Sequence, residues 1–118
     1  MIVAVALTAL LVNQQAASDS TPPVRLTSYE EAVHCAGLTQ AASELEGGES
    51  TRGRRLYDAA LYWSLSTIQA ARVAGRDPVV AEQSMTRIRI SAVRRLASSD
   101  NNLREHLNDC VRKAPDLQ

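Results

Sequence analysis

The sequence predicts an all-α protein, a small up-down four-helix bundle closed by one disulfide between its first and last helices. Apolar residues recur at spacings of three and four in four successive segments, and no segment after the N-terminal run shows the alternation of a strand. The chain's two cysteines lie in the first and last of these segments. Short connections favour antiparallel neighbours. A pair of tetratricopeptide-like helical hairpins is the alternative, although the four segments show no internal similarity.

The N-terminus has the order of a secretory signal peptide, which we assign to residues 1–18. A short apolar run without a preceding basic residue is followed by polar and then small residues that end at Ser18. Such a run falls short of the roughly 20 apolar residues that a membrane-spanning helix needs. We expect cleavage before Asp19, a periplasmic or secreted protein, and no stable membrane anchor after processing. An extended lead-in over residues 19–27 then precedes a single helical domain over residues 28–115.

The first helix of this domain begins at one of two overlapping capping boxes, Thr27 with Glu30 or Ser28 with Glu31. Glycines 47 and 48 end it. Its apolar residues fall on one narrow face, which comprises Cys35, Leu38, Ala42 and Leu45.

The second helix is expected over residues 51–74, before Gly75. Its polar residues follow one stripe, and apolar or small residues cover the rest of the circumference. This pattern indicates neighbours on both sides, so we expect the second helix to be the centre of the bundle. The polar stripe comprises Arg55, Asp58, Tyr62, Ser66, Gln69 and Arg72.

The third helix starts with an N-cap residue, Asp77, followed by Pro78 at the first helical position, and runs to Ala97. Ser99 or Asp100 caps the fourth helix, which ends before the proline at position 115. The predicted buried residues of these two helices are Ala81, Met85, Ile88, Ala92 and Leu96, and Leu103, Leu107, Cys110 and Val111.

Two cysteines in an exported chain predict a disulfide, and Cys35 and Cys110 lie on the apolar faces of the terminal helices. In an up-down bundle these helices are neighbours, and the two cysteines lie at similar heights. The competing interpretation is a metal site or a haem site that uses the cysteines with His34 and His106. Adjacent positions 34 and 35 project about 100° apart on a helix and do not converge on one tetrahedral ion. We therefore expect no metal and no cofactor, with His34 paired to Glu30 and His106 to Asp109.

The composition does not favour an enzyme or a nucleic-acid-binding protein. Thirteen basic and thirteen acidic residues give no net charge, so no overall field attracts nucleic acid. The acids concentrate in residues 19–51 and the arginines in residues 52–98, a division that neutralises itself within one bundle. His106, Asp109 and Cys110 supply the residue types of a catalytic set, but a disulfide would consume the thiol of Cys110, so we expect no catalytic residues.

The remaining candidate is a protein-contact surface formed by Tyr62, Arg87, Ile90 and Arg94, in which apolar side chains are flanked by arginines. We therefore expect an exported, non-enzymatic helical protein that acts as an accessory subunit or adaptor through contacts with another protein. In size, export and single disulfide the chain is similar to small periplasmic acid-stress chaperones, a likeness of class that assigns no residue. A stress chaperone is the first alternative, and a carrier of a small ligand, metal or haem is the second.

Overall fold

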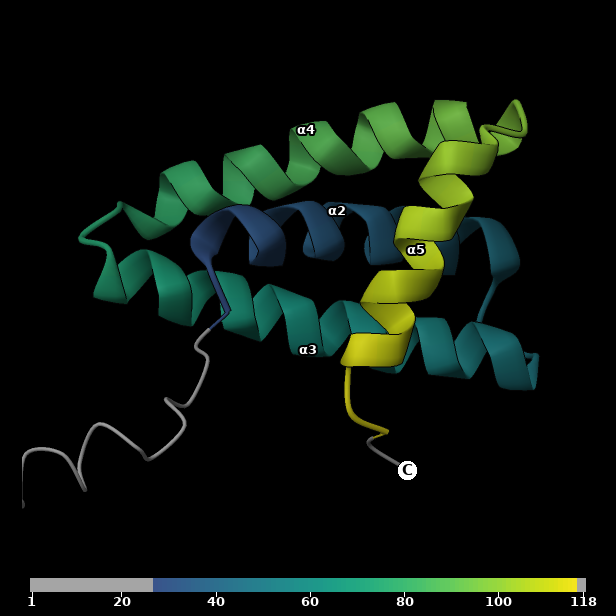
Figure 1. Ribbon diagram of the computed structural model, residues 1–118, viewed down its shortest axis with the longest axis horizontal. Helices are drawn as coiled ribbons and strands as arrows, with labels where there is room; N and C mark the ends of the chain where they lie inside the picture. The colour runs from purple at the N-terminus through teal and green to yellow at the C-terminus, as the bar shows by residue number, and fades with distance from the viewer. Residues whose placement is uncertain (1–26, 117–118) are drawn as a thin grey trace, which may run out of the picture.

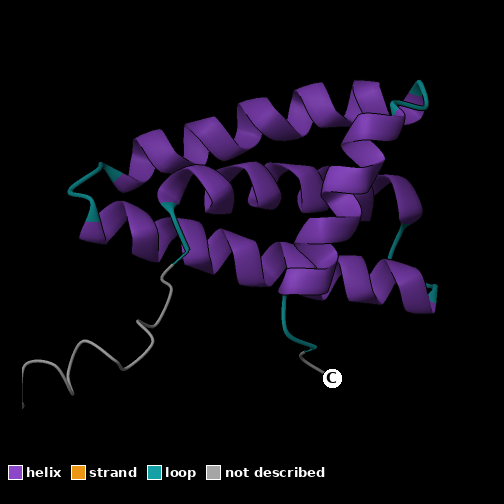
Figure 2. Cartoon of the chain, viewed as in Figure 1, coloured by secondary structure: helices purple, strands orange, loops and turns teal. Residues whose placement is uncertain are grey.

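The computed structural model describes residues 27–116, which fold into four helices joined by short turns (Figure 1). No strand occurs in this part of the chain (Figure 2). The predicted signal peptide and all of the lead-in except Thr27 lie outside the described residues. None of the described helices is both long and apolar enough to span a bilayer. The helices are α2 (Tyr29–Glu46), α3 (Thr51–Val73), α4 (Pro78–Ala97) and α5 (Asn101–Lys113).

The helix boundaries confirm the capping signals in the sequence. Ser28 is the N-cap of α2, and its hydroxyl accepts a hydrogen bond from the backbone N–H of Glu31 at 3.1 Å. Asp77 caps α4 with Pro78 in the first turn, and Asp100 caps α5. Each side-chain acceptor satisfies a backbone donor that the first helical turn leaves without a partner.

The central helix is α2, and the expectation that residues 51–74 form the centre is wrong. α2 lies between α3 and α4 (Figure 1). Half of its 18 residues are buried, and they lie around most of its circumference. They are mainly small, which lets two helices approach closely from different sides. α3, by contrast, keeps one long face exposed.

Gly37 shows how closely α4 approaches α2. A Cβ atom at this position would lie 2.5 Å from Cγ2 of Ile88 and 3.0 Å from the backbone nitrogen of Arg89. Both distances are shorter than van der Waals contact, so only glycine fits at this crossing. The packing of α2 against α4 therefore depends on glycine at position 37, which has no side chain.

The last helix, α5, crosses α2 and α3 at a steep angle instead of running alongside them (Figure 1). Its C-terminal end is held by Arg55 of α3, whose Nη2 donates hydrogen bonds to the carbonyl oxygens of Val111 and Ala114 at 2.6 and 2.8 Å. These carbonyls belong to the last turn of α5 and the residue after it, where helical acceptors are left unpaired. A residue expected on the solvent-facing stripe of α3 therefore anchors the last helix.

Candidate functional site

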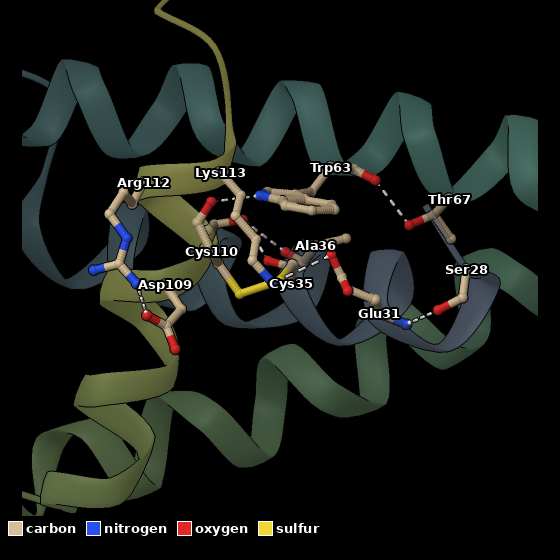
Figure 3. The surroundings of a disulfide bond; sticks show 11 residues. Ser28, Glu31, Cys35, Ala36, Trp63, Thr67, Asp109, Cys110, Arg112 and Lys113 are labelled. Atoms are coloured by element: carbon tan, nitrogen blue, oxygen red, sulfur yellow. Dashed lines mark hydrogen bonds and ion pairs between the residues drawn. A yellow bond between two sulfur atoms is a disulfide. The ribbon is translucent and has the colours of Figure 1, made fainter. Parts of the chain in front are cut away.

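The disulfide joins Cys35 of α2 to Cys110 of α5, as the sequence predicted (Figure 3). The two Cα atoms lie 5.5 Å apart, and 75 positions separate the residues along the chain. Both cysteines are buried. The bond therefore connects the first and last described helices through the core.

Trp63 links the disulfide to α3. Its indole Nε1 donates a hydrogen bond of 2.8 Å to the carbonyl oxygen of Cys110, and its side chain is buried (Figure 3). Tyr62 packs edge-on against the indole at a centroid distance of 5.1 Å. The hydroxyls of Thr39 and Thr67 are also buried, and they donate to the carbonyls of Cys35 and Trp63. The indole N–H and the two buried threonine hydroxyls around the disulfide thus have partners, as a stable core requires.

Three of the four residues in the competing metal-site interpretation lie close together in the structure. The ligand atoms of Cys35, His106 and Cys110 lie within 4.8 Å of one another, and His34 is not in this group. Both sulfur atoms are bonded to each other, so neither offers the thiolate that a zinc ion needs. With the disulfide formed, this cluster is a covalent cross-link between α2 and α5, and the exposed imidazole of His106 lies beside it.

The histidine pairings expected from the sequence do not form. Asp109 forms its ion pair with Arg112, and Glu30 forms its ion pair with Arg76. Within residues 27–116, neither imidazole has a hydrogen-bond partner. Both histidines are exposed, so water can solvate their ring nitrogens.

The corner between α4 and α5 is fixed by Asp100. Its carboxylate accepts a hydrogen bond from the backbone N–H of Leu103 and pairs with Arg95 at 2.9 Å. The backbone hydrogen bond and then the guanidinium lower the pKa of Asp100 below its ordinary value of 3.8. The charged carboxylate is therefore the form that holds this corner.

The structure does not bring the four predicted contact residues onto one surface. Arg87, Ile90 and Arg94 lie on the outward face of α4, where 43% of Ile90 is exposed. Tyr62 is half-buried on α3 and lines a hollow beside the N-terminus of α2. The α4 trio and Tyr62 are therefore separate features, with α2 between their helices (Figure 1).

The largest exposed apolar feature of α3 was missed in the sequence. Tyr57, Leu61 and Leu65 follow one another at intervals of four residues and are 61%, 44% and 64% exposed. We call these three residues the α3 row. The regular spacing was visible in the sequence, but the assumption of a central second helix assigned the residues to internal packing.

No protein-family model matches this chain, and no curated protein and no solved structure is significantly similar to it.

Proposed function

We propose that this chain is an exported, non-enzymatic adaptor or accessory subunit that binds another protein through the α3 row. The observation that carries the proposal is the exposure of Tyr57, Leu61 and Leu65 on successive turns of one helix. An exposed apolar row on a helix lowers the solubility of a protein unless a partner covers it. The partner we propose presents an apolar helix face, which packs along such a row.

The core does not need these side chains. Trp63, Leu56 and Ala59 of the same helix belong to the hydrophobic core, and all three are buried. The α3 row therefore lies outside the packing that holds the bundle together, and substitutions there should leave the fold intact. A specific interface buries about 1,600 Å² in total, so the row would form its centre and the neighbouring polar residues its rim.

The environment we propose is the periplasm or another exported compartment. Disulfides persist in oxidising compartments and are rare in the bacterial cytosol. The buried Cys35–Cys110 bond fits export, and cleavage after Ser18 would release the mature protein. A mature N-terminus at Asp19, measured by mass spectrometry on protein from the native host, would support this location, whereas retention of Met1 would contradict it.

The test of the contact surface is affinity capture from the native periplasm with matched variants. Leu61→Gln with Leu65→Gln should lose a partner that the wild type retains in stoichiometric amount. Val73→Gln is the control, because Val73 is 76% exposed on the same helix but lies outside the row. All variants should keep wild-type helicity by circular dichroism. Capture that survives the double substitution would exclude the α3 row as the binding site.

The arginines on α4 support a second candidate surface for the same function. Arg87 and Arg94 lie seven residues apart on its exposed face, with Ile90 between them. If this face docks the partner, Arg87→Glu with Arg94→Glu should abolish capture, and the wild-type complex should weaken as salt rises. Loss of capture only in the α3 double variant would assign the interface to the α3 row.

A stress chaperone is the competing function, and the capture experiment separates the two. A chaperone would retain a broad set of unfolded clients after its bundle opens, whereas an adaptor retains one folded partner. The disulfide ties the first and last helices together and opposes such opening. This constraint favours the adaptor.

A further inference from the structure

A small hollow lies where α2, α4 and the start of α5 meet. It shares Arg87 with the exposed face of α4 and contains no residue of the α3 row. Its volume is about 240 Å³. Four basic side chains from these three helices line it: His34 of α2, Arg87 and Arg95 of α4, and His106 of α5. No acidic residue is among the lining residues.

The floor of the hollow is apolar. Leu38 and Ala92 are buried there, and Ile88 and Leu103 are partly buried beside them. Binding sites for small organic molecules typically combine an apolar lining with a few convergent polar groups. A hollow of this size, just below the range of about 300–1,000 Å³ that drug-sized ligands occupy, suits a compact molecule.

The basic groups at the rim have unused donors. Arg95 is paired with Asp100, so part of its charge is neutralised locally. Arg87 makes only a long hydrogen bond of 3.4 Å to the hydroxyl of Ser84. An imidazole offers at least one N–H donor whether neutral or charged, and neither His34 nor His106 has a hydrogen-bond partner in the described chain. Donors on three helices thus surround one small space.

We propose that this hollow binds a small organic carboxylate, with its apolar body on the floor of Leu38 and Ala92 and its carboxylate between His34, Arg87 and His106. Guanidinium and imidazole N–H groups form strong hydrogen bonds with a carboxylate because this acceptor is charged. A bare inorganic anion would leave the apolar floor uncovered, and a neutral molecule would leave the basic rim without a counter-charge. The proposed ligand therefore needs both an apolar body and a carboxylate.

Benzoate is a suitable probe, because it joins a compact apolar ring to one carboxylate. Its neutral analogue benzamide tests the charge, and acetate tests the ring. Titration of the disulfide-intact, ¹⁵N-labelled chain should show benzoate shifting the backbone amides of Ala92 and Leu103, with benzamide and acetate binding about tenfold more weakly or not at all. Equal binding of benzoate and benzamide would overturn the proposal, as would equal binding of benzoate and acetate.

Variants locate the site. His34→Ala and Arg87→Ala should each weaken benzoate binding about tenfold, and Ser91→Phe should abolish it by filling the hollow while keeping the basic rim. Arg94→Ala is the control, since Arg94 lies on the same helix but does not line the hollow. Circular dichroism checks that each variant is folded. Unchanged affinity in His34→Ala and Arg87→Ala, or a similar loss in Arg94→Ala, would contradict the assignment.

Discussion

Replacing both Cys35 and Cys110 with alanine removes the covalent link between α2 and α5 and should lower the melting temperature by about 20 °C. The bond closes a loop of 75 positions, for which chain entropy gives about 4 kcal/mol at 25 °C. Unfolding a domain of roughly 90 residues has an entropy of about 0.19 kcal/mol/K, so 4 kcal/mol corresponds to about 20 °C. The hydrogen bond from Trp63 to the backbone carbonyl at position 110 does not need the sulfur and should survive.

Thermal unfolding followed by circular dichroism measures this shift. The oxidised wild type is compared with the double alanine variant and with the wild type in a strong reductant. Both disulfide-free samples should melt at nearly the same temperature, because both lack the same cross-link. A decrease of less than 5 °C in both samples would refute the reasoning, since it would mean that the unfolded chain gains little freedom when the link is lost.

Three further substitutions test the packing of the bundle. Gly37→Ala should destabilise the protein by about 1–3 kcal/mol in urea denaturation, because its Cβ would collide with α4. Gly48→Ala is the control and should be nearly neutral, because a Cβ there meets no atom within 4 Å. Equal effects of the two substitutions would disprove the close approach of α4 to α2. Trp63→Phe removes one of two donors to the carbonyl of Cys110, which also accepts from the backbone N–H of Ala114, and should cost about 1 kcal/mol in the same denaturation. An unchanged stability would contradict a contribution from this hydrogen bond. Asp100→Asn should retain the N-cap but lose the pH-dependent part of the stability. Folding lowers the pKa of the Asp100 carboxyl below its ordinary value of 3.8. The carboxylate therefore stabilises the folded state fully above pH 3.8, and this stabilisation disappears as the pH falls through the lowered folded-state pKa. The difference between wild type and Asp100→Asn, measured from pH 7 to pH 2, should therefore shrink on acidification, and a constant difference would contradict this origin.

Local signals in the sequence predicted the helices well. Asp77 before Pro78 located the start of α4, and the two overlapping capping signals at Thr27 and Ser28 located the start of α2 to within one residue, with Ser28 as the N-cap. Such signals act within one helical turn, so neighbouring helices do not alter them. The disulfide was also predictable, because two cysteines in one chain have only one intramolecular pairing.

The arrangement of the helices was harder to predict, because it depends on contacts between distant segments. Leu45 was assigned to the buried face of α2, yet it is 50% exposed near the end of the helix. Gly37 is compatible with any helix that tolerates glycine, and its role appears only when Ile88 packs against it. Arg55 has a polar periodicity, but its partners are carbonyls more than 50 positions away. Periodicity identifies a face and does not identify its neighbour.

The same distinction applies to the candidate sites. The row of Tyr57, Leu61 and Leu65 is a periodic apolar pattern that fits internal packing and a contact surface equally well at the level of sequence. The hollow beside α5 unites His34 and His106, which 71 intervening positions separate. Only the fold brings such residues together.

The most direct test of the proposed function is site-specific crosslinking in the native host. A photoreactive phenylalanine analogue at position 65 places the reactive group on the most exposed member of the α3 row, and the same analogue at position 73 provides a control of comparable exposure on the same helix. The proposal predicts one discrete, stoichiometric adduct with another exported protein from position 65 and no adduct from position 73. No adduct from position 65, or the same adducts from both positions, would contradict binding through the α3 row.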